Sequence, residues 1–179
     1  MHKKEPWEWA ILAMLALFAL AALGVVAFSW SKEDWRIDLT VDLPLTPDQA
    51  FVALADAGHR VDWEYGVTLV APLMGEDGTV GATRLLYMRA NDRTWQIDET
   101  LTGYAPPNSW SAERSTDMWR TSVHWTLAQT AEGSRLHWQE TRQFSGLSPR
   151  LFALFTMHQH KKRLEQSLQH LAAMHWPDD

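Results

Sequence analysis

Two glutamates, Glu99 and Glu140, form the pair of acids that the sequence places best for general acid–base chemistry. Each alternates with apolar residues along a predicted strand: Glu99 with Trp95, Ile97 and Leu101, and Glu140 with Leu136 and Trp138. Because successive side chains of a strand point to opposite faces, both carboxylates are expected on the apolar side of a sheet. Burial and mutual proximity would shift their pKa values there, as catalysis requires.

The alternative is that both acids are structural. A β-bulge would reverse the alternation, and an acid near a sheet edge would form a salt bridge with Arg142 or Arg84. Glu99 and Glu140 are therefore weak catalytic candidates, and we assign no catalytic residue.

Four histidines lie in the last predicted helix, at positions 158, 160, 170 and 175. His158 and His160 are about 200° apart on a helix, and His160 and His175 are about four turns apart, so neither pair can share a metal ion. The chain has no cysteine, which excludes disulfides and thiolate metal sites. We expect no metal and no cofactor. The sequence leaves open whether one inward-facing histidine of this helix contacts a ligand.

The last helix is predicted at residues 148–175, with Pro149 in its first turn and Pro177 after its end. Its apolar residues recur at three-, four- and seven-residue spacings and share one face: Ala153, Met157, Leu164, Leu168 and Leu171. Such a stripe needs a partner surface, which the preceding strand-like segments supply. We expect the concave face of an antiparallel sheet to meet this helix, with space between them for an apolar ligand.

Alternation and turn signals set the order of the other elements. Residues 36–43 predict a first strand, Thr46 and Pro47 predict the start of a helix that ends at Gly58, and a helical turn is expected at 59–64. Further strands are expected at residues 67–72, 80–89, 94–103, 109–115, 118–129 and 134–144.

Several local motifs occur in this order. Residues 44–56 (PLTPDQAFVALAD) join the first strand to its helix through a proline-containing turn, Trp63 follows that helix, Val80-Gly81 opens a middle strand, and Gly133-Ser134-Arg135-Leu136 lies in a hairpin. Their order and spacing resemble the START-related helix-grip superfamily, also called SRPBCC, and within it the polyketide cyclase/dehydrase and lipid-transport group. The resemblance covers about residues 36–175.

The resemblance implies an α+β helix-grip fold, in which a curved antiparallel sheet wraps around the long C-terminal helix. It also implies a mainly apolar cavity, which family members use for lipids, sterols, polyketides or hormones. It implies no reaction, because the family includes both enzymes and non-catalytic carriers.

We prefer a binding protein for a hydrophobic small molecule or lipid held between the sheet and the C-terminal helix. Its ligand contacts are expected at Trp95, Ile97, Trp125, Trp138, Met157, Leu164 and Leu168, whereas Arg120 and His124 alternate onto the solvated face. One rival is a cyclase-, dehydrase- or hydrolase-type enzyme that uses Glu99 or Glu140. Another is a structural or assembly factor whose cavity is filled by its own side chains.

The apolar patch at residues 151–155 surrounds nearly the whole helix, which is more than one buried stripe requires. It is the functional surface in the assembly-factor interpretation. Otherwise it is a ligand entry, a membrane contact, or a surface covered by a preceding loop.

Residues 10–28 contain no charged residue and form a helix about 28 Å long, close to the roughly 30 Å thickness of the hydrocarbon core. Tryptophans flank this run at positions 7, 9, 30 and 35, where aromatic rings favour the headgroup level. We expect a single-pass membrane anchor, with the bilayer as its partner. The alternative is a cleaved signal peptide, for which Ala27 and Ser29 offer small residues, but the apolar run is longer than usual.

Two basic residues precede the span and two follow it closely, so the α-amino group decides in favour of a cytoplasmic N-terminus. We expect a bacterial inner-membrane protein with its domain on the periplasmic side. The net charge of −6 and the lack of a basic cluster disfavour nucleic-acid binding, so we expect no nucleic acid as a partner. The predicted boundaries are a tail at 1–9, an anchor at 10–29, a linker at 30–35 and one domain at 36–176.

Overall fold

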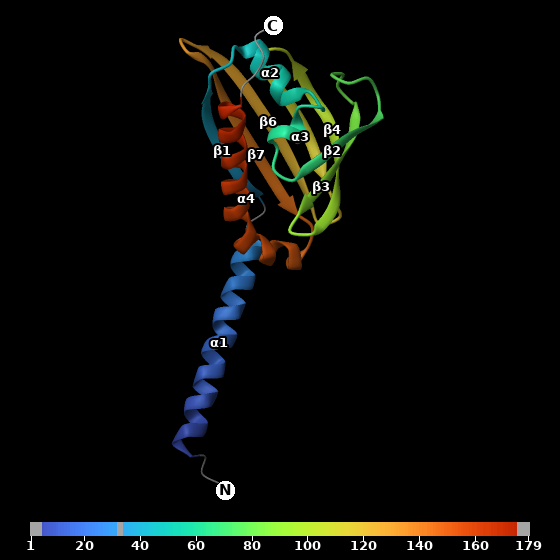
Figure 1. Ribbon diagram of the computed structural model, residues 1–179. Helices are drawn as coiled ribbons and strands as arrows, with labels where there is room; N and C mark the ends of the chain where they lie inside the picture. Colours follow the sequence, from blue (N-terminus) through green and yellow to red (C-terminus); the bar gives the residue numbers. More distant parts are fainter. Residues whose placement is uncertain (1–4, 32–33, 175–179) are drawn as a thin grey trace.

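The computed structural model describes residues 5–31 and 34–174 (Figure 1). Parts of the predicted tail, linker and domain end, His175 among them, lie outside these residues. The elements, in order, are α1 (Pro6–Ser31), β1 (Asp34–Leu43), α2 (Pro47–Ala55), α3 (Arg60–Trp63), β2 (Val67–Met74), β3 (Thr83–Ala90), β4 (Arg93–Ala105), β5 (Ser109–Ser115), β6 (Trp119–Thr130), β7 (Gly133–Phe144) and α4 (Leu147–Ala173).

The seven strands form one antiparallel sheet in the order β1-β7-β6-β5-β4-β3-β2. The sheet curves around α4, with α2 and α3 on the same face (Figure 1). Asn91 and Asp92 connect β3 to β4 with φ values of 48° and 60°, as a tight hairpin turn requires. The predicted helix-grip fold is confirmed. We call the end of the sheet beside α1 the proximal end and the opposite end the distal end.

The predicted helix start at Thr46 is also confirmed. The Thr46 side chain accepts a hydrogen bond from the backbone N–H of Gln49, and the Gln49 side chain accepts one from the backbone N–H of Thr46. This reciprocal capping box satisfies two donors that a helix start otherwise leaves unpaired.

The expected strand at residues 80–89 begins later, at Thr83. Residues before it form a turn in which the N–H of Ala82 donates to the carbonyl of Thr79, and Gly81 has a φ of 94°. A residue in this left-handed region cannot continue the extended backbone of a strand. The predicted strand was therefore too long at its start, because the sequence pattern continued into the residues of the preceding turn.

The apolar stripe of α4 faces the sheet as predicted. Its five members are all buried: Ala153, Met157, Leu164, Leu168 and Leu171. They share one buried cluster with Trp110, Trp125 and Trp138 of the sheet and with Trp63, whose indole N–H donates to the carbonyl of Ala53 at 3.0 Å. α4 packs chiefly against β1 and against the end of α1, with smaller contacts to α3 and β7.

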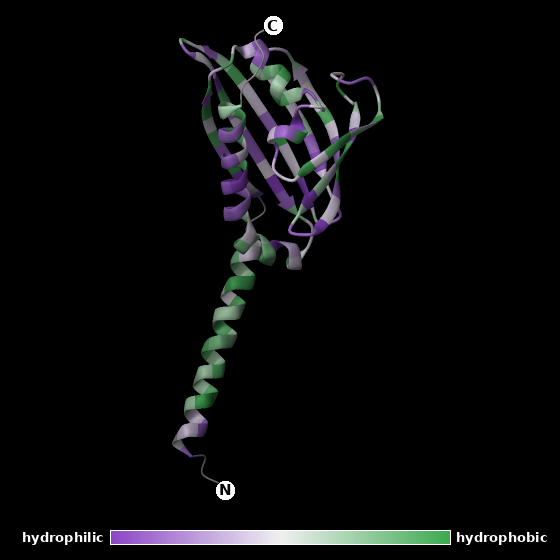
Figure 2. Ribbon diagram, in the orientation of Figure 1, coloured by the Kyte–Doolittle hydropathy of each residue, from purple (hydrophilic) through white to green (hydrophobic). Residues whose placement is uncertain are grey.

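Helix α1 projects away from the domain (Figure 1) and is hydrophobic along most of its length (Figure 2). Its segment Trp7–Ser29 is long and apolar enough to cross a membrane. At 1.5 Å per residue this segment measures about 34 Å. Its last residue, Ser29, is buried, and the C-terminal end of α1 meets the first turns of α4.

Candidate functional site

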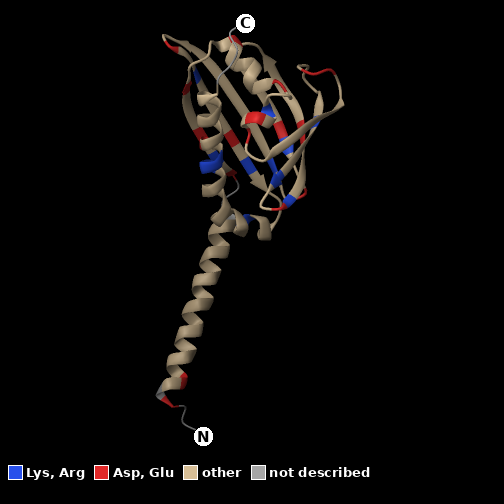
Figure 3. Ribbon diagram, viewed as in Figure 1, with Lys and Arg blue, Asp and Glu red and all other residues tan. Residues whose placement is uncertain are grey.

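A row of polar and charged side chains crosses the inward face of the sheet. Its members pair in register on five neighbouring strands, β3 to β7: Arg84, Glu99, Arg114, Thr121 and Arg142. We call this set the charged row. Figure 3 shows the acidic and basic positions side by side across the middle of the strands. The predicted cavity wall is therefore not uniformly apolar.

Glu99 lies at the centre of one half of this row. Its Oε1 accepts a hydrogen bond of 2.6 Å from Arg60 Nη1, its Oε2 accepts one of 2.8 Å from Arg114 Nε, and Arg84 Nη1 is 3.9 Å away. Burial opposes ionisation of Glu99, but the charges of Arg60 and Arg114 outweigh it and lower the pKa of Glu99 to about 2. At neutral pH this carboxylate has no proton to donate, and it is too weak a base to remove one efficiently.

Glu64 completes this half of the site from the end of α3. It accepts hydrogen bonds from Arg60 Nη2 at 2.6 Å and from Arg114 Nη1 at 2.8 Å. Burial alone would lower the pKa of Arg60, but the charges of Glu64 and Glu99 raise it above its ordinary value. Two carboxylates and two guanidiniums thus neutralise one another and fasten α3 to the sheet.

Glu140 lies at the centre of the other half, on β7 two residues before Arg142 and on the same face of the strand. Its Oε2 is 3.0 Å from His160 Nε2 of α4, and its Oε1 is 3.1 Å from Arg142 Nη2. Burial raises the pKa of Glu140, but His160 and Arg142 outweigh it and lower the pKa to about 2. An ionised Glu140 favours a hydrogen on Nε2 of His160, which leaves Nδ1 as the other reactive nitrogen.

Arg142 has three further neighbours. Its Nε donates to the Thr121 hydroxyl at 2.7 Å, its Nη2 lies 3.2 Å from His160 Nε2, and its guanidinium lies 4.3 Å from the ring centroid of Trp119. Burial lowers the pKa of Arg142. The Trp119 face and the Glu140 carboxylate both stabilise its positive charge.

The inward orientation predicted for Glu99 and Glu140 is therefore confirmed. Both expected salt partners are present: Arg142 lies 3.1 Å from Glu140, and Arg84 forms a longer ion pair of 3.9 Å with Glu99. Sequence reasoning did not find Arg60, Glu64, Arg114 or the pairing of His160. Arg114 alone had a usable signal, because it alternates with the buried residues Trp110 and Ala112 on β5.

The charged row divides the inward apolar residues into two clusters. The larger one lies on the distal side of the row and continues under α4; it contains Trp125, Trp138, Met157, Leu164 and Leu168 of the predicted ligand contacts. The smaller one lies on the proximal side and consists of Val67, Val70, Leu86, Met88 and Ile97. Trp119 packs against this smaller cluster.

The predicted ligand contacts therefore do not form one continuous wall. Trp125 and Trp138 are packed within the larger cluster, Ile97 is in the smaller cluster, and Trp95 is 40% exposed near the proximal end of β4. Ligand contact at these residues stays a prediction. Arg120 and His124 are exposed on the outward face, as predicted. Among residues 5–31 and 34–174, no three histidines or acids are grouped to hold a metal ion.

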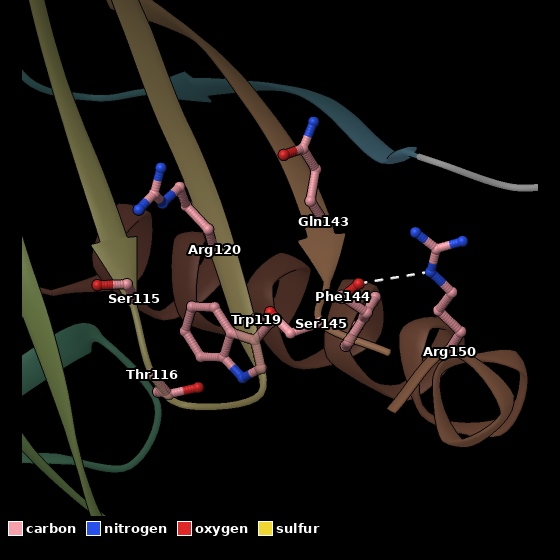
Figure 4. Close-up of a pocket in the computed structure, with 8 residues that line it drawn as sticks. All are labelled: Ser115, Thr116, Trp119, Arg120, Gln143, Phe144, Ser145 and Arg150. Atoms are coloured by element: carbon pink, nitrogen blue, oxygen red, sulfur yellow. Dashed lines mark hydrogen bonds between the residues drawn. The ribbon is translucent and has the colours of Figure 1, made fainter. Parts of the chain in front are cut away.

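One pocket lies at the proximal end of β5, β6 and β7, where the first turn of α4 closes it (Figure 4). It has a volume of about 500 Å³. Polar groups predominate in its lining, which includes Ser115, Thr116, Arg120, Gln143, Ser145 and Arg150. Arg150 Nε donates to the carbonyl of Phe144 at 3.4 Å, which holds the first turn of α4 to the end of β7.

The family described as "Polyketide cyclase / dehydrase and lipid transport" matches residues 34–175. The chain belongs to this family. The match covers the whole sheet and α4, so the sequence resemblance and the observed architecture agree. No curated protein matches the chain.

Solved structures share the fold of this family member at low sequence identity. The crystal structure of Ara h 8.0201 is 12% identical with a TM-score of 0.65, covering 78% of this chain and 95% of that one. The di-domain ARO/CYC protein StfQ from the steffimycin biosynthetic pathway is 12% identical with a TM-score of 0.64, covering 79% of this chain and 50% of that one. Major latex-like protein 151 from Panax ginseng is 11% identical with a TM-score of 0.62, covering 82% and 100%.

Proposed function

We propose that this protein is a membrane-anchored binding domain that holds a hydrophobic small molecule or lipid between the sheet and α4. The observation that supports this proposal is the position of the charged row between two apolar clusters. A ligand on the inward face would meet apolar side chains and ion-paired groups on adjacent positions of the same strands. We infer that the ligand is amphiphilic.

The polar group of the ligand is best placed beside Arg142 and His160. Both oxygens of Glu99 are already bonded to buried arginines, so that half of the site is closed by its own partners. His160, by contrast, keeps a 33% exposed side chain. Arg142 Nη1 makes no hydrogen bond to another residue in the described part of the chain. An N–H of Arg142 could therefore donate to a carboxylate, phosphate or hydroxyl oxygen of the ligand, and Nδ1 of His160 could accept a hydrogen bond from a ligand hydroxyl group.

The apolar part of the ligand would lie on the smaller cluster, with Met88, Ile97 and the ring of Trp119. These residues are at the proximal end of the sheet, beside α1. If α1 spans the bilayer, the apolar cluster faces the membrane from which a lipid would enter. This arrangement favours local exchange with the membrane over transport by a freely diffusing carrier.

Native mass spectrometry tests this function on the full chain, reconstituted in nanodiscs that contain one synthetic phosphatidylcholine. We expect a bound molecule whose mass differs from that of the nanodisc lipid. His160→Gln should reduce its occupancy several-fold, whereas His170→Gln, an exposed position on the same helix, should not. A protein recovered without a bound molecule would contradict the proposed binding function and favour the assembly-factor interpretation. Equal occupancy in both variants would contradict the placement of the ligand's polar group beside His160.

The membrane anchor has its own test. We expect mass spectrometry of the protein recovered from membranes to show an intact N-terminal segment, because the apolar run is longer than that of a usual signal peptide. A mature chain that begins near Trp30 would overturn anchoring by α1.

An enzyme is the second candidate, and the contact between Glu140 and His160 favours it. Glu140 holds one nitrogen of His160 and orients the ring, as the carboxylate of a catalytic dyad does. His160 rather than either glutamate would then be the acid or base. A turnover found by substrate screening that is lost in Glu140→Gln and His160→Gln, and kept in His170→Gln, would support this candidate over simple binding.

A further inference from the structure

The first turns of α4 expose two large aromatic side chains, Phe152 and Phe155, which are 67% and 74% exposed. They lie three residues apart and therefore share one face of the helix. Ala153 and Met157 on another face are buried in the domain. The two phenyl rings are therefore not part of the hydrophobic core, and exposing both to water is unfavourable.

The location of these rings indicates what covers them. The first turns of α4 run across the C-terminal end of α1 before the helix turns along the sheet (Figure 1). Ser29, the last residue of the candidate span, is buried at this junction. Phe152 and Phe155 are therefore at the level where α1 would leave the hydrocarbon core, about 30 Å from its other end.

The pattern further along α4 agrees with this location. The same face continues with Gln159 and Lys162, which are exposed and polar, and Figure 2 shows α4 as mostly hydrophilic where it runs along the sheet. A soluble partner lying along the helix would need apolar residues beyond Phe155. The exposed aromatic surface of α4 instead stops at Phe155.

The lining of the polar pocket near these rings is also consistent with contact with a membrane surface. Arg150 is two residues before Phe152, and the pocket that it lines also contains Arg120 and several hydroxyl groups. Among the described residues, no carboxylate lies within 4 Å of the Arg120 guanidinium. Guanidinium and hydroxyl groups at this level are suited to lipid phosphates, whereas phenyl rings are suited to the acyl chains beneath.

We propose that the first turns of α4 lie in the surface of the bilayer, with Phe152 and Phe155 inserted among acyl chains and Arg150 at the level of the phosphates. The proposal rests on the anchoring by α1 that belongs to the proposed function. It adds a second membrane contact that fixes the domain's orientation. The proximal end, with the smaller apolar cluster, then faces the lipid directly.

The absence of cysteine makes a clean test available, because one introduced cysteine per variant can take a nitroxide label. The full chain would be labelled at Leu17→Cys in α1, at Phe155→Cys, at Lys162→Cys on the same face of α4, and at Glu132→Cys in the distal hairpin. Each variant would be placed in vesicles of phosphatidylcholine and phosphatidylglycerol. Collision rates with oxygen, which concentrates in lipid, and with a water-soluble nickel chelate would then be measured.

We expect oxygen collisions to predominate at positions 17 and 155, and nickel collisions to predominate at positions 162 and 132. If position 17 is in lipid while position 155 collides mainly with nickel, the second membrane contact is wrong and the anchor stands. Protection of position 155 from both reagents would show a protein partner or a second copy, which also overturns the proposal. A water-exposed position 17 would overturn the anchor itself.

Discussion

The carboxylate of Glu99 on β4 lies 2.6 Å from the guanidinium of Arg60 on α3, 39 residues earlier in the chain. Both side chains are buried. This ion pair fixes the short helix α3 against the centre of the sheet, and Glu64 and Arg114 extend it to a four-membered network. The stability of this half of the domain therefore depends on one set of charges.

Removal of the Glu99 charge should be strongly destabilising. Glu99→Gln leaves Arg60 and Arg114 buried without their shared carboxylate, and breaking a buried pair costs about 3–5 kcal/mol. Denaturant unfolding of the full chain in detergent would measure this loss. The neighbouring outward-facing change Asp98→Asn should stay within about 0.5 kcal/mol. Equal effects of the two substitutions would contradict the assigned role of Glu99.

Acidification should destabilise the domain between about pH 4.5 and pH 2. The pKa values of Glu99 and Glu140 are lowered from 4.5 to about 2 in the folded state. Below pH 4.5 the unfolded chain therefore binds protons that the folded chain does not, so stability is lost as the pH falls. Unfolding free energies over this range would show the slope, which should be shallower in Glu99→Gln. A pH-independent stability would contradict the lowered pKa values.

Glu140 and His160 should be energetically coupled between β7 and α4. A double-mutant cycle with Glu140→Gln and His160→Gln should give about 1–3 kcal/mol, because Glu140 is buried. The exposed pair of Asp42 and Arg135, 2.7 Å apart, provides the control and should give a clearly smaller coupling energy, because water screens exposed charges. If the two cycles agree, the contact between Glu140 and His160 does not hold α4 to the sheet.

Gly133 should tolerate no side chain. Its φ is 145°, and a Cβ there would lie 2.2 Å from the carbonyl oxygen of Leu43. Gly133→Ala should therefore cost more than about 3 kcal/mol, since strained backbone alone costs about 1–3 kcal/mol. Gly81 has a φ of 94° but open space around it, so Gly81→Ala isolates the strain without the clash. Thermal unfolding of the two variants should place Gly133→Ala well below Gly81→Ala.

Much of the architecture is local in origin and could be predicted from the sequence. Alternation along β4 and β7 correctly placed Glu99 and Glu140 on the inward face, because a strand has a fixed two-residue period. The spacing of Leu164, Leu168 and Leu171 likewise gave the buried face of α4, and the capping residues at Thr46 gave the start of α2. In each case, neighbours in sequence determine the structure.

The tertiary structure alone decided which of these residues meet. Arg60 reaches Glu99, and His160 reaches Glu140, because of the register between strands and the position of two helices over the sheet. Alternation assigns a side chain to a face, but it does not assign its neighbour across strands. The predicted ligand wall was therefore divided by a charged row that no single strand reveals. Similarly, the patch at residues 151–155 was visible in the sequence, while its location beside the end of α1 required the packing of two helices more than 100 residues apart.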